Sequence, residues 1–341
     1  MPPRLHPAGL PSETSMQSTR RQFLGGASAA ALAGFLPFPA AAQAWPGKPI
    51  RFVVPFAPGG SSEIIARAAA GELSKSFGQN VFVDNKPGAS GNIAMQEVAR
   101  ADDQHTIILG HIGTLAVNPY MYDKLPYDPN KDFKPVSLLA KVPSLYVVNP
   151  NVPAKDLKEF VALIKAKPGT MNYGSAGNGS AGHLAMEYLK MAAGLFITHI
   201  PYKGTGPQLT DLLAGRLEAA SVGASAILPY IKAGKLRCIA TGSTQRLPQL
   251  PDVPTVAEQG FPGFEMTQWY GMLAPASMAQ ANIDKLAAET QKAMKAPATL
   301  ERLNQDAAQA IGGTPAQFAQ FIAQEQKRWK QVVERAKIKP E

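Results

Sequence analysis

The chain has 341 residues and a formal net charge of +9 at pH 7, which allows one large or two ordinary domains and favours anionic small molecules or a membrane surface as partners. Its lysines are scattered singly, without the interleaved aromatic residues of a single-strand groove, so we exclude nucleic acid. After residue 44, no stretch reaches the roughly 18 apolar residues that a membrane span needs.

Residues 1–44 are predicted to be a twin-arginine signal peptide. Arg20 and Arg21 precede an uncharged run rich in alanine and glycine, which ends in the small-x-small triplet Ala42-Gln43-Ala44. We expect cleavage after Ala44 and a periplasmic product, with either Met1 or Met16 as the true start. The alternative is a basic arm on a cytosolic protein, but such an arm needs neither the apolar run nor the triplet.

The first half of the mature chain alternates short apolar runs with a helical pattern. Strands are expected at 49–56, 81–84 and 106–110, and a helix at 63–77 with an apolar stripe along one face. This order predicts a parallel sheet with helices on both faces. A proline-rich connection, residues 118–135, follows.

The second half begins with an extended run at 136–149, broken only by Pro143, and then repeats the α/β pattern. Helices are expected at 155–165, 184–191, 207–214 and 226–233, and strands at 171–173, 196–201, 217–222 and 236–241. The single Cys238 lies in the last of these strands and is assigned to packing. Residues 248–263 should carry only short turns, a strand should cover 269–274, and two amphipathic helices should close the chain.

The predicted fold is α/β with two lobes, each a mostly parallel sheet flanked by helices. Lobe 1 comprises residues 45–143 and 266–341, and lobe 2 comprises residues 144–265. The chain crosses between the lobes near Lys141 and near Met266. Two crossings leave a cleft that is able to close on a ligand.

Two glycine-rich loops join strands to helices and face each other in this arrangement. One is Pro55 to Glu63, and the other is Tyr173 to His183. Glycine lets the backbone approach a ligand, and the first N–H groups of a helix have no internal partner, so such loops bind carboxylate or phosphate. Either loop alone is also a common way to reverse the chain. The pair favours an anion site.

Three enzyme classes were tested against the motifs. Residues 177–182 match Gly-x-Gly-x-x-Gly, but the next strand ends without the acidic residue that holds a ribose. No serine has the flanking glycines of a hydrolase elbow, and the histidines lack metal-ligand spacing. We therefore expect no catalysis, metal or cofactor, with an exported oxidoreductase kept as an alternative.

Six motifs occur in one order along the mature chain, at residues 50–60, 85–93, 125–129, 172–183, 201–204 and 250–255. In this order they resemble the Bug receptors, the periplasmic solute-binding proteins of tripartite tricarboxylate transporters. The resemblance implies a Venus-flytrap fold of type II-like topology that captures a small carboxylate and hands it to membrane subunits. We expect the receptor to be a monomer. The alternative is a sensor of the same fold that signals to a membrane partner.

The resemblance also implies which residues contact the carboxylate, largely through backbone N–H groups, small hydroxyls and bridging water. These are Phe56, Ala57, Gly59, Gly60 and Ser61 in the first loop and Ser175, Ala176, Gly179, Ser180 and His183 in the second, with Gly110, His111, Tyr202 and Lys203 nearby. For His183, a purely local role at the helix start stays open.

Two departures from the family pattern bear on the ligand. Glu63 stands where the family usually has Asp. Its carboxylate either contacts the ligand or only interacts favourably with the positive end of the helix dipole. At residues 221–224, where relatives often carry Asp or Asn, the chain has Ser-Val-Gly-Ala. We expect a ligand less amine-like than an amino acid, an aromatic or aliphatic monocarboxylate or dicarboxylate.

Overall fold

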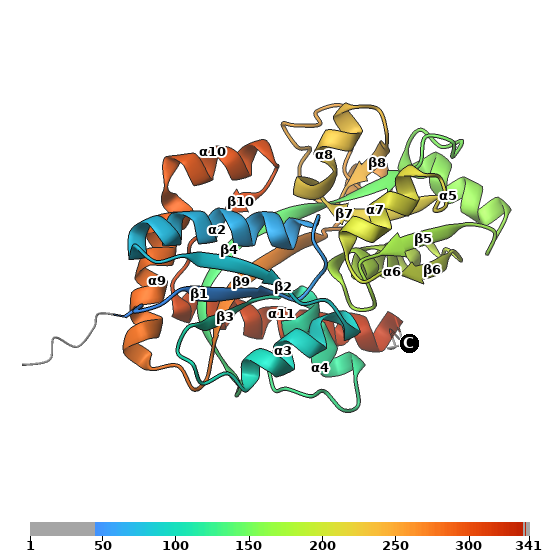
Figure 1. Cartoon of the computed structure of the whole chain (residues 1–341). Helices are drawn as coiled ribbons and strands as arrows, with labels where there is room; N and C mark the ends of the chain where they lie inside the picture. The colour runs from blue at the N-terminus through green and yellow to red at the C-terminus, as the bar shows by residue number, and fades with distance from the viewer. Residues whose placement is uncertain (1–44, 337, 339–341) are drawn as a thin grey trace, which may run out of the picture. The chain divides into compact units, whose positions relative to one another are not determined.

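The computed structural model describes residues 45–336 and residue 338 (Figure 1). The predicted twin-arginine signal, the cleavage after Ala44 and the choice between Met1 and Met16 lie outside the described residues. Among the described helices, none is both long and apolar enough to cross a membrane.

A ten-stranded sheet runs through this part of the chain in the order β2-β1-β3-β9-β4-β7-β5-β6, and β10 and β8 also pair with β4 (Figure 1). The strands are β1 (Ile50–Val54), β2 (Val81–Asn85), β3 (Thr106–His111), β4 (Phe133–Val148), β5 (Asn172–Ser175), β6 (Thr198–Pro201), β7 (Ala219–Gly223), β8 (Arg237–Thr241), β9 (Thr267–Pro275) and β10 (Gln309–Ala310).

Two parallel strand triplets are joined by long antiparallel strands. The triplets are β2-β1-β3 and β7-β5-β6, whereas β4 and β9 run antiparallel to their neighbours. The predicted two-lobed α/β class is confirmed, and its sheets are mixed because the strands that cross between the lobes run against the triplets. The lobe limits at 143/144 and 265/266 stay a prediction.

Pro143 does not break β4, although the sequence pattern predicts an interruption there. The strand pairs with β9 as far as Pro143, opposite Thr267, and pairs with β7 from Ser144 onward. Proline cannot donate a ladder hydrogen bond and is tolerated where pairing changes. The proline therefore lies where β4 exchanges one partner strand for another.

Helices cover both faces of the sheet (Figure 1). The helices are α2 (Ser61–Phe77), α3 (Asn92–Ala99), α4 (Asn118–Met121), α5 (Leu157–Ala166), α6 (Ala181–Ala193), α7 (Thr205–Leu213), α8 (Ala224–Lys232), α9 (Gln280–Lys295), α10 (Pro297–Gln305) and α11 (Pro315–Ala336), with short helical turns at Ala89–Gly91, Gly113–Val117 and Ala257–Gln259. The chain after β9 thus forms three helices where two were predicted, because Pro297 ends one helical segment and starts the next.

Alternate residues of β1 belong to two separate cores. Phe52 belongs to the core that also holds residues of α2, α7, α8 and α9, whereas Val53 belongs to the core that holds residues of α3, α5, α6 and α11. This alternation is the strand period of two. Cys238 in β8 is buried, as predicted, and burial raises the pKa of its thiol to about 12, so it remains a packing residue.

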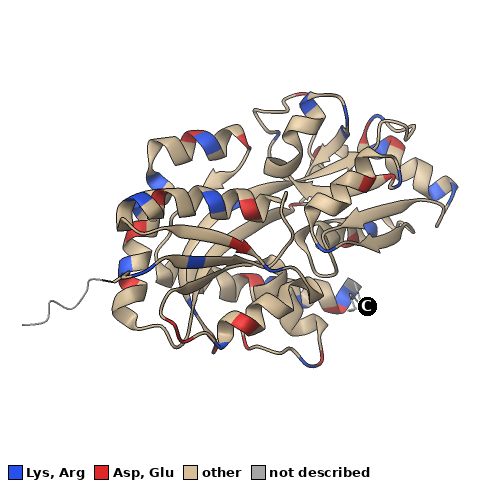
Figure 2. Cartoon of the chain, viewed as in Figure 1, with Lys and Arg blue, Asp and Glu red and all other residues tan. Residues whose placement is uncertain are grey.

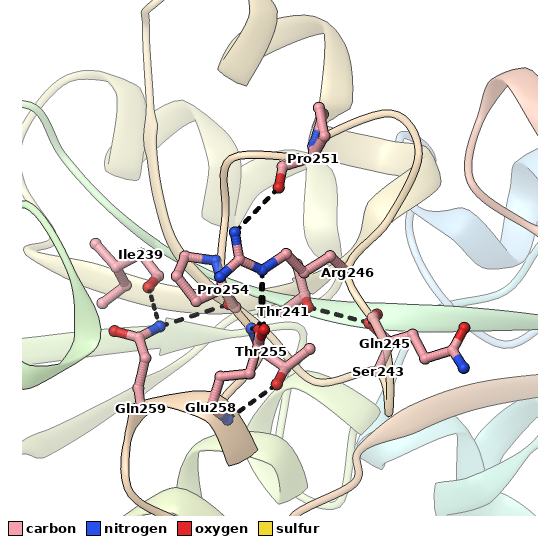
Figure 3. Close-up of polar contacts among 10 residues, drawn as sticks. All are labelled: Ile239, Thr241, Ser243, Gln245, Arg246, Pro251, Pro254, Thr255, Glu258 and Gln259. Atoms are coloured by element: carbon pink, nitrogen blue, oxygen red, sulfur yellow. Dashed lines mark hydrogen bonds and ion pairs between the residues drawn. The ribbon is translucent and has the colours of Figure 1, made fainter.

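The loop after β8 carries the motif at residues 250–255 and is fixed by local polar contacts (Figure 3). Arg246 Nε donates to both carboxylate oxygens of Glu258, at 3.0 and 3.1 Å, and Arg246 Nη1 donates to the Pro251 carbonyl. Glu258 Oε2 accepts from the Thr255 N–H, and Thr255 Oγ1 accepts from the Glu258 N–H. This reciprocal capping explains the motif as a loop-building element.

Gly271 on β9 provides a test of the packing between sheet and helix. A Cβ at this position would lie 2.0 Å from Cζ of Phe318, whose ring on α11 is fully buried. We expect Gly271→Ala to lower the free energy of unfolding by about 1–3 kcal/mol, because the ring or the strand must move. Urea denaturation measures the change.

The matched control is Gly71→Ala at an exposed position of α2, where a Cβ meets no atom within 4 Å. Alanine is the better helix former, so this variant should gain roughly 0.5–1 kcal/mol. Unchanged stability of Gly271→Ala would contradict the packing described for α11 and β9.

Candidate functional site

A small cavity lies beyond the carboxyl ends of β1, β3, β5 and β7, where ligands bind in sheets with parallel strands. Its volume is about 30 Å³, room for roughly one water molecule. A metabolite would need the walls to move apart.

Four helices begin at the wall of this cavity. Ser61 and Ser62 start α2, Ala181 and Gly182 start α6, Thr205 starts α7, and Gly223 directly precedes α8. No side chain of the described residues caps α2, α7 or α8. Their first N–H groups and the positive ends of their dipoles therefore favour an anion.

The described residues that line the cavity include no Asp, Glu, Lys or Arg. Charged residues are spread instead over helices, loops and strands of the chain (Figure 2). The positive potential of the cavity therefore comes from backbone dipoles and not from a salt-bridging side chain.

His111, the last residue of β3, contributes a neutral donor. The Gly113 N–H donates to His111 Nδ1 at 2.8 Å, which leaves the ring proton on Nε2. The ring packs against Phe56, with centroids 4.7 Å apart, and the side chain is 2% exposed. Burial lowers the pKa of His111 to about 3, so the imidazole is uncharged at neutral pH.

Three buried polar atoms at the cavity have no partner at hydrogen-bond geometry among the described residues: His111 Nε2, Ser61 Oγ and Ser221 Oγ. Ser61 Oγ does lie near enough to the Tyr270 hydroxyl to act on the pKa of that group. Other polar groups of the wall are occupied. The Tyr270 hydroxyl donates to Gln268 Oε1 at 2.7 Å, and Gln208 Nε2 donates to the Gly174 carbonyl at 2.9 Å. Buried polar groups are normally paired, so the three unpaired atoms mark where a polar ligand would bind.

The second glycine loop is held in place by two stacked histidines, the buried His183 and the partly buried His199. The Gly179 N–H donates to His183 Nδ1 at 3.0 Å, and the His183 ring stacks on His199 with centroids 4.2 Å apart. Ser175 Oγ lies 2.7 Å from His199 Nε2 and also bonds within the loop, to Gly177. Burial lowers the pKa of His183 to about 4 and that of His199 to about 3. These contacts use Ser175, Gly179 and His183 to shape the loop.

Glu63 and Gly110 have local structural roles. Glu63 Oε2 accepts from the Gly59 N–H at 2.8 Å, and its Oε1 pairs with Arg67 at 2.6 Å. A Cβ on Gly110 would meet the side chains of Leu115 and Leu273, so this glycine allows close packing behind β3.

The two sides of the cavity meet through backbone contacts. The Ala57 N–H donates to the Lys203 carbonyl at 3.2 Å. A Cβ on Gly206 would lie 2.4 Å from the Pro58 carbonyl oxygen, and a Cβ on Gly60 would lie 2.9 Å from Thr205 Oγ1. Glycine is thus required for the loop before α2 to reach the start of α7.

Tyr202 and Lys203 line a different, more open hollow of about 600 Å³, together with Ser90 and Asn178. The Tyr202 hydroxyl donates to Asp211 Oδ2 at 2.7 Å, and burial together with this carboxylate raises the pKa of Tyr202 to about 12. These two residues lie outside the wall of the small cavity.

The structure therefore divides the predicted site residues into groups. Phe56, Ser61, His111, Ala176 and Ser180 line the small cavity. Sequence reasoning omitted from the site Thr205 and Gln208 of α7 and Gln268 and Tyr270 of β9, which help to complete the wall. Ser221, Val222 and Gly223 of β7 also line it, and the sequence analysis considered them only as a departure from the family pattern. Gly204 follows β6 and Gly223 ends β7, and each directly precedes a helix, so the pattern used for the two predicted loops also marks α7 and α8.

Within residues 45–336 and 338, no three His, Cys, Asp or Glu side chains gather as metal ligands would. The wall consists instead of small hydroxyl, amide and backbone groups around a neutral histidine. Such a set suits hydrogen bonding to an anion.

Residues 65–338 match the family described as the tripartite tricarboxylate transporter family receptor. The chain is 36% identical over 297 residues to protein BugT of Bordetella pertussis, covering 86% of this chain and 91% of BugT.

Solved structures agree with this match. Rpa4515 of R. palustris with adipate superposes with a TM-score of 0.84 at 34% identity, covering 87% of this chain and all of that one. MatC of Rhodopseudomonas palustris with bound malate gives a TM-score of 0.81 at 33% identity, covering 85% of this chain and all of MatC. A family of solute-binding receptors gives no support to the oxidoreductase alternative. The chain belongs to the tripartite tricarboxylate transporter receptor family, which includes the Bug proteins.

Proposed function

We propose that this protein is a periplasmic receptor that captures a small carboxylate metabolite in the cavity and delivers it to the membrane subunits of a tripartite tricarboxylate transporter. The observation that carries the proposal is the set of three unpaired, buried polar atoms where four helices begin. A carboxylate supplies the acceptor oxygens and the negative charge that this arrangement favours. The relatives with adipate and malate support a carboxylate as the ligand class.

Capture works by closure of the two predicted lobes. Because the cavity holds only about 30 Å³, a metabolite reaches it when the loop before α2 separates from the start of α7. Closure around the ligand then restores the backbone contact between Ala57 and Lys203 and removes water from the donors, which strengthens their hydrogen bonds.

The ligand class can be tested by titration calorimetry. We expect at least one of succinate, malate, adipate, citrate and nicotinate to bind, whereas its uncharged amide should bind at least about tenfold more weakly, because the helix ends act on charge. Equal binding of an acid and its amide, or no binding by any of the acids, would refute a carboxylate receptor.

Closure can be tested with Gly206→Ala. Its Cβ would lie 2.4 Å from the Pro58 carbonyl oxygen and outside the cavity wall. We expect affinity for the best-binding acid to fall at least about tenfold, and small-angle scattering to show less compaction on ligand addition than in the wild type.

Gly71→Ala serves as the control for Gly206→Ala, since a Cβ there contacts nothing within 4 Å. It should bind and compact as the wild type does. If Gly206→Ala compacts on ligand addition as the wild type does, the contact between the loop before α2 and the start of α7 is not part of capture.

A further inference from the structure

We propose that His111 sets the ligand specificity: its Nε2–H donates to an oxygen of the ligand and, with the hydroxyls of Ser61 and Ser221, selects small carboxylates that carry no ammonium group. This inference rests on the proposed function and adds which chemical feature of the ligand the site recognises.

The direction of the hydrogen bond follows from the tautomer. Because Nδ1 of His111 accepts from the Gly113 N–H at 2.8 Å, the neutral ring can only donate through Nε2. The ring cannot easily turn to exchange its nitrogens, since it packs on Phe56 and is 2% exposed. A Cβ on Gly113 would lie 2.5 Å from His111 Cε1, so the backbone also confines the ring.

The three free groups belong to different elements of the wall. Ser61 lies at the start of α2, His111 at the end of β3 and Ser221 in β7, and their exposed fractions are 4%, 2% and 1%. None of the three has a partner at hydrogen-bond geometry among the described residues, although Ser61 lies near the Tyr270 hydroxyl. A ligand that meets them therefore contacts strands and helices from both parts of the sheet at once.

An ammonium group has no anionic partner among the described residues of this wall; the open serine hydroxyls could accept a hydrogen bond from it, but they carry no charge. It would need acceptors, best of all a carboxylate, and the described lining residues include neither Asp nor Glu. His111 Nε2 offers a proton and no lone pair, and the starts of α2, α6, α7 and α8 carry positive partial charge. An amino acid would thus bring its ammonium group against donors and positive dipoles.

The test compares acids that differ only by an ammonium group. Calorimetry of the wild type with succinate and aspartate, and with glutarate and glutamate, should show at least about tenfold tighter binding of the acid without the amine in each pair that binds. Aspartate or glutamate binding as tightly as its partner would overturn the inference while leaving the carboxylate receptor intact.

Two variants assign the effect to the Nε2 donor. His111→Phe keeps a ring beside Phe56 but removes the donor, and it should weaken binding of succinate or glutarate at least about tenfold. His111→Gln places an amide N–H near the position of Nε2 and should recover most of that loss. A structural role alone would affect both variants alike.

His105→Phe is the matched control, because His105 directly precedes the other end of β3 and does not line the cavity. This variant should leave the affinities for succinate and for glutarate unchanged. Wild-type affinity of His111→Phe, confirmed as folded by its thermal transition, would disprove the role of His111. If neither the four acids of this experiment nor the wider acid panel binds the wild type, the carboxylate receptor itself fails, and with it this inference.

Discussion

The convergence of helix N-termini at one end of the strands is the constraint on which the site depends. Helices α2, α6, α7 and α8 follow strands β1, β5, β6 and β7, and their N-termini, whose first N–H groups have no partner within the helix, lie around one cavity. A positive potential results without any Lys or Arg among the described wall residues. Gly60, Gly204 and Gly223 precede three of these helices and leave the N–H groups uncapped by side chains. Serine or aspartate there would occupy the donors that an anion needs.

Glycine has a second purpose, which is to let backbone meet backbone across the cavity. Gly206 faces the Pro58 carbonyl, Gly113 faces the Gly179 carbonyl, and Gly223 lies beside Ser61 Oγ, each so close that a Cβ would come within 2.5 Å. Side chains at these positions would hold the two sides apart. The long strand β4, with Pro143 at its change of partner, supplies a connection between the two sheet regions. The glycines that allow the two sides to come close and the strand that connects the two sheet regions thus belong to different segments of the chain. Closure about a hinge requires this separation.

The sequence predicts those parts of the site that follow from a local pattern. A strand, a glycine and a helix in succession identify the loops at Pro55 to Glu63 and Tyr173 to His183, and the resemblance adds His111. Gln268 and Tyr270 could not be placed in the same way, because β9 reaches the cavity only through its long-range pairing with β3 and β4. For His183 and for Glu63, a ligand contact and a local role at the helix start both predict the same residue in the same place. Only the contacts in the structure distinguish the two roles. The contacts show His183 bonded to Gly179 and Glu63 bonded to Gly59 and Arg67.

The neutral hydrogen-bond donors link ligand binding to the proposed closure of the cavity. When the two sides approach with nothing between them, His111 Nε2, Ser61 Oγ and Ser221 Oγ are buried without partners, at a cost on the order of 1–3 kcal/mol for each group. In the proposed mechanism, opening lets water satisfy these atoms, and a carboxylate would satisfy them in the closed arrangement. Under this proposal the ligand would bind the closed form more tightly than the open form, which is the condition for shifting the equilibrium between them. A buried Lys or Arg would bind an anion too, but its unpaired charge would penalise closure far more and would oppose release to a membrane partner.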